Sequence, residues 1–357
     1  MSDSVNEVNE AVNDRTRTAG GAPAPAGPGH GVLRLAADAF LRRREATILL
    51  VAIGLMIYFQ ASTDGVFLSH NNLVNLSQST APFAIIAVGQ VLLLVSGEID
   101  LSAGATFTFA PFMMHYLIDY YGVYPVPAII LSVLVGAAIG FGNGFIVVVL
   151  KVPSFVATLG MLFLVGGIML TTSNAFPAEI PQAARGAVQN WFGLAEWSQL
   201  IWCLLIVVFF QTLLTRTRWG LYTIATGGNR LGAAEAGIRT GRIKIGNFMI
   251  TGGLAAFAGI LEVFRTQTID PTLSGADFAS AMFTAVSAAV IGGTALAGGS
   301  GTVVGALFGA FVLAELRNGF NLIGISANPF NIILGLAILL SMILNVYLAN
   351  LRRAGRT

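Results

Sequence analysis

The chain has 357 residues, of which 55% are hydrophobic and only 10% are charged, whereas soluble proteins carry about 25% charged residues. This composition excludes an ordinary soluble domain and indicates a polytopic membrane protein. The net charge of +2 is too small for a nucleic-acid-binding surface, and the one cysteine and three histidines lack metal-ligand spacing. We therefore expect no nucleic-acid partner, and neither a metal nor a cofactor in this chain.

Residues 1–45 precede the first apolar segment. They are polar and then rich in Pro, Ala and Gly, with no apolar run that could bury surface, so we predict a disordered cytoplasmic tail. They also lack the basic start and apolar core of a cleaved signal peptide. The first hydrophobic helix is therefore expected to stay in the mature protein.

Ten apolar segments follow between residues 46 and 350, and each is close to the roughly 20 residues that cross a membrane as a helix. They predict an all-α, polytopic transmembrane bundle of about ten helices, some of them broken, with a short cytoplasmic tail at 351–357. Glycines between 292 and 301 interrupt the eighth and ninth segments, which are also compatible with one broken element. The predicted spans are 46–60, 72–96, 101–119, 126–150, 154–173, 198–215, 245–264, 279–296, 301–317 and 329–349.

The basic residues indicate the orientation of the bundle. With a cytoplasmic N-terminus and ten crossings, 16 of the 19 lysines and arginines fall on the cytoplasmic side, and Arg185, Arg265 and Arg317 fall outside. Cytoplasmic loops of membrane proteins carry such an excess of Lys and Arg. We therefore predict that both termini and the loop at 216–244 are cytoplasmic, and that the loop at 174–197 lies outside.

Glycines repeat at four-residue spacing in two segments, which places each set along one helix face. In lipid no hydrophobic force drives helices together, so small residues that allow close backbone approach mark packing faces. We interpret both sets as packing seams, with sliding along them during transport as the alternative. The residues are Gly136, Gly140 and Gly144 in the fourth segment, and Gly301, Gly305 and Gly309 in the ninth.

Two acidic residues separate the second and third segments, in SGEIDLSAG at 96–104. A carboxylate in lipid costs a few kcal/mol, so Glu98 and Asp100 must face water, a partner or a helix end. Two interpretations remain open. The segment is either a short cytoplasmic turn in which Asp100 or Ser102 caps the third helix, or a broken helix whose Glu98, Asp100 and Ser102 line a translocation path.

Other ionisable residues occur in or near the apolar segments. Glu262, Arg265, Glu315 and Arg317 lie near predicted helix ends, where charged side chains can extend to the interface, and we expect that position for all four. His115, inside the third segment, is interpreted as a hydrogen-bonded packing residue. A proton relay is the alternative.

The polar stretch at 216–244 is the most unusual of the chain. Asn229 is a suitable N-cap for a short helix with the sequence LGAAEAGI, which ends in glycine. This helix is too short to be stable alone. We therefore favour a docking element for a soluble partner over a plain loop.

Aromatic residues gather in the loop predicted to lie outside. Trp191, Phe192 and Trp197 fall within 174–197, and tryptophan is enriched at membrane interfaces. An interfacial aromatic belt is the first interpretation. A gate, or a platform for an extracytoplasmic protein, is the other.

Neither lysine of the chain belongs to a nucleotide-binding loop. A Walker A loop needs G-x-x-x-x-G-K-[ST], but Lys151 follows Leu150 and Lys244 follows Ile243. The sequence also shows no Ser-His-Asp, metal or paired-carboxylate constellation. We predict a non-catalytic chain, whose energy for any uphill transport comes from an ion or from another chain.

With these residues in view, the sequence resembles the permease subunits of bacterial ABC importers for ribose, xylose and related simple sugars. The match covers nearly everything after residue 45, and Glu98 departs from it, because many relatives have a small residue there. Four stretches carry the match in order: FLSHNNLVNL at 67–76, SGEIDLSAGA at 96–105, NGFIVVVLKVPSFVATLGML at 143–162, and TRTRWGLYTIATGGNRLGAAEAGI at 215–238 followed by GGTALAGGSGTVVGALFGA at 292–310.

The resemblance implies a type II-like importer fold and three kinds of partner: a second permease copy, a cytoplasmic ATPase subunit and an extracytoplasmic sugar-binding protein. It also implies that the short helix of the cytoplasmic loop couples to the ATPase. That role falls on Gly227, Gly228, Asn229, Ala233, Ala234, Ala236, Gly237 and Ile238. The alternative function is a secondary sugar transporter in which Glu98, Asp100 or His115 carries a proton or cation.

Overall fold

The computed structural model describes residues 44–271 and 276–325, together with the single positions 332, 335, 336, 339 and 343. The predicted tail at 1–45, except for its last two residues, lies outside this part of the chain. So do the C-terminal tail and all but five positions of the predicted tenth span. From Arg44 onward the chain clusters into one compact unit.

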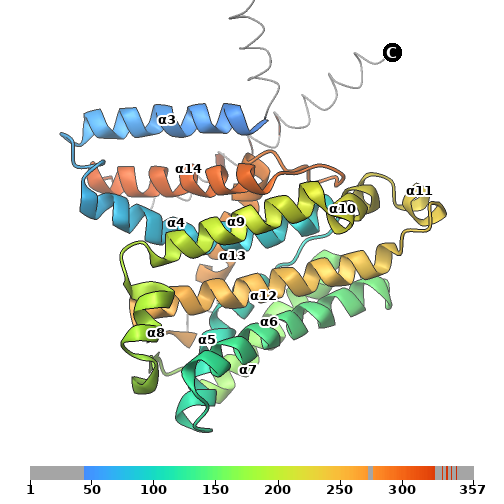
Figure 1. Cartoon of the computed structure of the whole chain (residues 1–357), viewed down its shortest axis with the longest axis horizontal. Helices are drawn as coiled ribbons and strands as arrows, with labels where there is room; N and C mark the ends of the chain where they lie inside the picture. The colour runs from blue at the N-terminus through green and yellow to red at the C-terminus, as the bar shows by residue number, and fades with distance from the viewer. Residues whose placement is uncertain are drawn as a thin grey trace, which may run out of the picture. The chain divides into compact units, whose positions relative to one another are not determined.

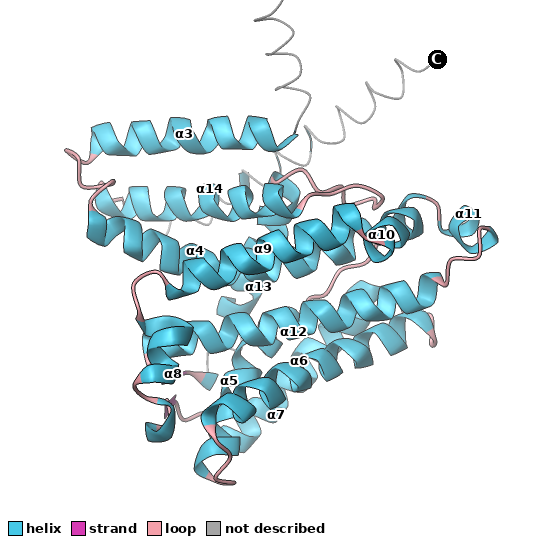
Figure 2. Cartoon of the chain, in the orientation of Figure 1, coloured by secondary structure: helices cyan, strands magenta, loops and turns pink. Residues whose placement is uncertain are grey.

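The described part of the chain is all-α apart from two very short strands (Figure 2), which confirms the predicted fold class. The first five helices are α3 Arg44–Ser62, α4 His70–Val95, α5 Ala103–Asp119, α6 Pro125–Val148 and α7 Ser154–Ser173. An irregular region then contains β1 Ala178–Glu179, η1 Gln182–Ala184, α8 Ala187–Gln189 and η2 Asn190–Leu194. The second half contains α9 Ser198–Arg216, α10 Arg218–Gly228, α11 Arg230–Glu235, α12 Thr240–Thr266, β2 Thr268–Ile269, α13 Ala276–Ile291 and α14 Val303–Leu322.

Six helices of the described residues are long and apolar enough to cross a membrane, namely α4, α6, α7, α9, α12 and α14. A helix satisfies its own backbone hydrogen bonds, which is why such apolar runs adopt this structure in lipid. The eighth and ninth predicted spans are two separate helices, since Gly293 with a φ of 92° follows the end of α13. α14 runs to Leu322, five residues beyond its predicted end.

α12 occupies the middle of the bundle and packs against α4, α5 and α6, while α14 packs against α3, α4 and α13 (Figure 1). α10 and α11 lie at one end of this unit, and α8 lies at the opposite end. There the two strands pair antiparallel, with Ala178 opposite Ile269. The two predicted loops, 174–197 and 216–244, are thus on opposite ends of the helices.

Glycines occupy the contact between α6 and α12. A Cβ on Gly140 would lie 2.1 Å from the carbonyl oxygen of Phe248, and a Cβ on Gly136 would lie 2.6 Å from that of Gly252. Gly144 faces the backbone of Ile245 in the same way. Only residues without a side chain allow the two backbones to approach this closely.

The second glycine set lies at the start of α14. A Cβ on Gly305 would lie 2.1 Å from the carbonyl oxygen of Gly292, and a Cβ on Gly309 would lie 2.1 Å from that of Ala288. Gly301 differs from the expectation of a single helical stripe, because it precedes α14 and faces Val95 instead. The glycine run at 298–301 forms a turn there, so the helical spacing does not extend back to Gly301.

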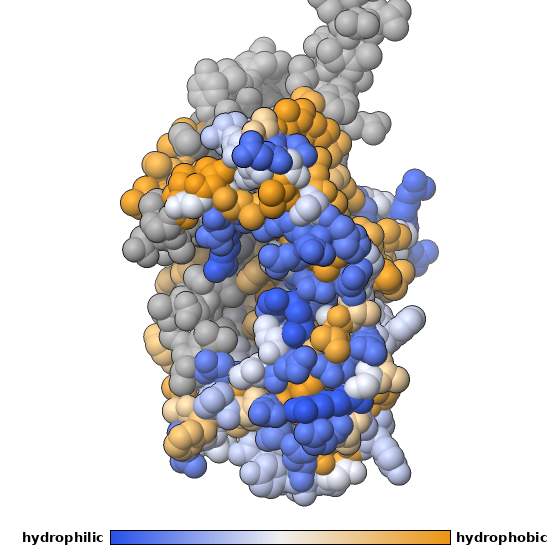
Figure 3. Space-filling model, turned by 90° about the vertical axis from the view of Figure 1, so that its left-hand side faces the viewer, coloured by the Kyte–Doolittle hydropathy of each residue, from blue (hydrophilic) through white to orange (hydrophobic). Residues whose placement is uncertain are grey.

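The end of the bundle that carries α8 presents a polar surface. Figure 3 faces this end and shows hydrophilic residues gathered over its middle, with hydrophobic residues toward its edges. Along the helices, by contrast, large apolar side chains such as Leu205, Val208 and Phe163 are exposed. Polar ends and apolar sides are the pattern of helices that cross a bilayer.

Candidate functional site

The polar stretch at 216–244 forms α10, α11 and the start of α12. The Oδ1 of Asn229 accepts a hydrogen bond from the backbone N–H of Gly232 at 3.0 Å, which confirms the predicted N-cap. Gly237, with a φ of +82°, then turns the chain toward α12. α11 itself is shorter than predicted and ends at Glu235.

Most of the predicted coupling residues lie on the surface of this segment. Gly228, Asn229, Ala234, Ala236 and Gly237 are exposed, Gly227 and Ile238 are partly buried, and Ala233 is buried. Leu231, next to them, is 78% exposed although it is apolar. The segment therefore offers an uncovered surface of small and apolar groups at this end of the bundle.

The same segment touches the rest of the molecule through backbone atoms. A Cβ on Gly227 would lie 1.8 Å from the carbonyl oxygen of Val95 at the end of α4. The backbone N–H of Gly299 donates to that same oxygen at 2.8 Å. We call this meeting of Val95, Gly227 and Gly299 the backbone junction. It joins α10 directly to the end of α4 and to the turn before α14, with no side chain between them.

Glu98 lies near this junction, in the connection between α4 and α5. It forms an ion pair with Lys244 of α12, and the two side chains are only 12% and 9% exposed. Glu98 also lines a pocket of about 260 Å³ together with Lys151, Ser154 and Arg230. Glu98 is therefore neutralised at the α11 end of the bundle.

Asp100 and Ser102 form a buried hydrogen-bond network in the same connection. The Oδ1 of Asp100 accepts from the backbone N–H of Ser102 at 2.8 Å and from its hydroxyl at 2.7 Å. Asn143 of α6 donates to the Ser102 hydroxyl at 2.7 Å, and Gln90 of α4 donates to the Asp100 carbonyl oxygen at 2.7 Å. Two of the three predicted path residues, Asp100 and Ser102, are buried at 1% and 0% exposure, and their network fastens the α4–α5 connection to α6.

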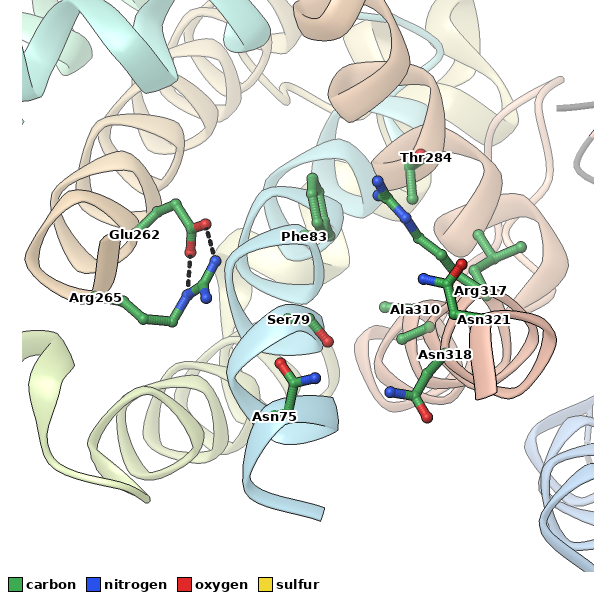
Figure 4. Close-up of a pocket in the computed structure, with 12 residues that line it drawn as sticks. Asn75, Ser79, Phe83, Glu262, Arg265, Thr284, Ala310, Arg317, Asn318 and Asn321 are labelled. Atoms are coloured by element: carbon green, nitrogen blue, oxygen red, sulfur yellow. Dashed lines mark hydrogen bonds and ion pairs between the residues drawn. The ribbon is translucent and has the colours of Figure 1, made fainter. Parts of the chain in front are cut away.

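A polar cavity of about 350 Å³ lies between α4, α12, α13 and α14 (Figure 4). Figure 4 shows side chains of α4 facing side chains of α14 across it, with Arg317 extending toward Phe83. At its edge, the amides of Asn72 and Asn318 bond to each other in both directions, at 3.0 and 2.9 Å. The polar or aromatic lining residues are Asn75, Ser79 and Phe83 of α4, Glu262 and Arg265 of α12, Thr284 of α13, and Arg317, Asn318 and Asn321 of α14.

Four charged residues that we expected at the membrane interface prove to have different roles. Glu262 and Arg265 form an ion pair and line the cavity, as does Arg317. Glu315 is fully buried inside α14, so the expectation was wrong for this residue. The physical reason is that α14 continues to Leu322, which places Glu315 two turns inside the helix instead of at its end.

His115 and the aromatic loop agree with the simpler interpretations only in part. His115 Nδ1 lies 3.0 Å from Asp119 Oδ2 on the same helix, but this contact lacks hydrogen-bond geometry. The ring packs against Phe112 and Tyr116. Trp191 is 68% exposed, but Phe192 packs inward and stacks on Trp202, with ring centroids 5.5 Å apart. Phe192 is therefore not part of an exposed aromatic belt.

The sequence reasoning did not find Asn75, Ser79 and Phe83. They recur every four residues along α4, which places them on one helix face, and this spacing was a usable signal. Arg317 and Asn321 show the same spacing on α14. What the sequence could not show is that the two faces oppose each other.

Comparison with known proteins gives a consistent picture. The family described as "Branched-chain amino acid transport system / permease component" matches residues 72–342. The xylose/arabinose import permease protein XylH of Sulfolobus acidocaldarius is 39% identical over 316 residues, which cover 86% of each chain. The ribose import permease protein RbsC of Escherichia coli K12 is 34% identical over 300 residues, which cover 83% of this chain and 92% of the relative.

A third relative has a different named cargo. The autoinducer 2 import system permease protein LsrC of Salmonella typhimurium is 34% identical over 303 residues, which cover 83% of this chain and 84% of the relative. No solved structure matches the chain. All three relatives are import permeases by name.

Proposed function

The chain belongs to the permease-component family of the branched-chain amino acid transport system, and from this membership we propose that it is the pore-forming subunit of an ATP-driven importer for a monosaccharide. The cargo is a pentose, a hexose or a related polyol, moved by alternating access. The observation that carries the proposal is 39% identity to a xylose/arabinose import permease along 86% of both chains. Similarity to a ribose import permease supports the same class of cargo.

The energy in this proposal comes from a separate ATPase subunit that docks on α10 and α11. The sequence has no Walker A lysine, and the exposed segment around Ala234 offers a surface for a partner. The backbone junction gives that partner a direct connection to α4. The docking residues are Gly227, Gly228, Asn229, Ala233, Ala234, Ala236, Gly237 and Ile238, and this chain binds no cofactor of its own.

Two further partners complete the proposed importer. An extracytoplasmic sugar-binding protein delivers the cargo to the end that carries α8, and a second permease copy forms a homodimer. We place the complex in the bacterial cytoplasmic membrane with both termini and α11 on the cytoplasmic side. The excess of basic residues at that end supports this orientation.

The relatives favour this function over a secondary transporter. Such a transporter would use Glu98, Asp100 or His115 to carry a proton or cation. Each of these side chains is already engaged, Glu98 by Lys244, Asp100 by Ser102, and His115 by Asp119. The names of the relatives describe import permeases.

Substitution of Ala234 tests the proposed docking surface. Ala234→Arg adds a long charged side chain to the exposed face of α11, so we expect loss of ATPase binding in a pull-down and loss of ATP-dependent sugar uptake, with normal membrane insertion. Ala183→Arg makes the same change at an exposed site on the opposite end and should retain ATPase binding. If Ala234→Arg binds the ATPase and transports sugar as the wild type does, α11 is not the docking site.

A further inference from the structure

We infer that the polar cavity between α4 and α14 is a polyol-binding site of the permease itself, in which Asn75, Asn321 and Arg317 bind hydroxyl groups and Phe83 packs against the sugar ring. The inference rests on the proposed function for its class of cargo. It adds a place where the membrane subunit itself holds that cargo. The inference also moves the expected translocation path of the sugar away from Asp100 and Ser102, which are buried in their own hydrogen-bond network.

The free amides of the cavity suit a polyol. Among the described residues, the side-chain amides of Asn75 and Asn321 make no hydrogen bond with another residue, and both residues are exposed to the cavity or its mouth. Each amide has a carbonyl acceptor and an NH₂ with two donors. Neighbouring hydroxyls of a sugar also both donate and accept, so one amide can bind two of them at once. The planar guanidinium of Arg317, which also lines the cavity, has several donors in a fixed fork.

The charges of the cavity argue against a positively charged cargo. The Arg265 Nε donates to Glu262 Oε2 at 3.1 Å, and its NH2 group bonds to Oε1, so both oxygens of this carboxylate are occupied. A free carboxylate is a stronger partner for an ammonium group or a metal cation than a neutral oxygen is. Since no other acidic side chain is among the described lining residues, an uncharged, hydroxyl-rich molecule fits this cavity better than a cationic one.

Size and location agree with this assignment. The volume of about 350 Å³ is near the lower end of the roughly 300–1,000 Å³ typical of small-molecule sites. The polar lining residues of α4 lie in its first half, and those of α12 and α14 lie in their last two turns. All of these belong to the half of the bundle that contains α8. In the proposed orientation the cavity is reached from outside before the backbone junction is.

Thiol protection on the purified permease tests the site without any partner. Ser79→Cys and Ala314→Cys place reporters on two walls of the cavity, in a Cys203→Ala background, and Ala183→Cys is the control on the exposed loop. N-Ethylmaleimide labelling is measured with D-xylose, D-ribose, L-arabinose or L-leucine. At a sugar concentration tenfold above its Kd, we expect labelling of either reporter to slow about tenfold, with no change at Ala183→Cys.

A second set of variants separates direct binding from a change in folding. Asn75→Leu or Asn321→Leu, added to a reporter, should raise the sugar concentration for half-protection roughly three- to tenfold, since one hydrogen-bonding group is lost. Gln78→Leu is the control on the same helix, because the Gln78 amide donates to the carbonyl oxygen of Glu196 and not into the cavity. This variant should leave the sugar concentration for half-protection unchanged. If Asn75→Leu, Asn321→Leu and Gln78→Leu change the half-protection concentration equally, the assignment of this binding site is wrong.

The remaining outcomes are also decisive. Protection by L-leucine alone would replace the polyol with an amino acid, and absence of protection by every sugar at both reporters would overturn the inference. Because this assay uses the permease alone, its failure is distinct from failure of the ATPase pull-down. If no sugar slows labelling in the cavity but the chain still binds the ATPase, the sugar-binding site is refuted and the proposed function is not.

Discussion

Gly140→Ala is the sharpest test of how the bundle is held together. The new Cβ would lie 2.1 Å from the carbonyl oxygen of Phe248, 2.7 Å from its carbonyl carbon and 3.0 Å from the Cα of Met249. All three are backbone atoms of α12, so no side-chain rotation relieves the contact. Ordinary contact begins near 3.4 Å, which leaves the closest pair about 1.3 Å too near. α6 and α12 must therefore separate along much of their shared face.

The expected magnitude follows from two opposing effects. Overpacking of this kind costs about 1–3 kcal/mol, whereas alanine in place of glycine stabilises a helix by roughly 0.5–1 kcal/mol. The packing cost is larger, so Gly140→Ala should lower the apparent melting temperature of the detergent-purified protein, measured by the loss of its monodisperse peak after heating.

Gly142→Ala is the matched control on the same helix. Its Cβ would meet only the flexible end of Met161, at 3.4 Å, so its melting temperature should equal or exceed that of the wild type. If the two variants melt together, α6 and α12 do not meet backbone to backbone at Gly140, and the reasoning from small residues fails.

Two other predictions concern charge and orientation. Lys244→Met leaves Glu98 buried without its partner, which costs about 3–5 kcal/mol in buried pairs. It should therefore lower the melting temperature far more than Arg185→Met, which breaks the exposed pair with Glu179. Adding Glu98→Gln to Lys244→Met should restore most of the lost stability, and a double variant no more stable than Lys244→Met would contradict the pairing. The orientation is tested in cells that express the Cys203→Ala background, with a thiol reagent that does not cross membranes. The reagent should label Ala183→Cys in intact cells and Leu231→Cys only after the cells are opened. The reverse pattern would invert the proposed orientation.

Hydropathy was enough to predict the fold class and most of the spans. Long apolar runs are stable in the hydrocarbon core of a bilayer, where an unpaired backbone group costs several kcal/mol, so such runs form helices. The glycine spacing at Gly136, Gly140 and Gly144 marked a tight face. It did not identify α12 as its partner, since that contact joins residues about 100 positions apart in the chain.

Charged and polar residues inside the bundle were the main source of error. Arg317 made the ninth span appear to end early, because hydropathy treats a charge as a boundary, and Glu315 was then placed at the interface instead of in the core. Asn75 and Ser79 escaped notice for a related reason. Polar residues near the start of an apolar span look like residues of the membrane interface. Only the fold shows that α14 lies opposite the face of α4 that carries Asn75 and Ser79.

α4 connects the two regions to which we assign roles in transport, the backbone junction and the polar cavity. Val95, at one end, belongs to the backbone junction, and Phe83, about 18 Å away at 1.5 Å per residue, faces the cavity. Between Phe83 and Ser79 stands Pro82, which has no N–H for the carbonyl of Gln78 and so removes one rung of the helical ladder. Pro82 is therefore the position at which α4 bends most easily, and it lies beside the cavity. If the proposed ATPase docks at α11, a push on Val95 would bend α4 at Pro82 and change the distance from Phe83 to Asn75. Work done at one membrane surface would then change sugar binding near the other.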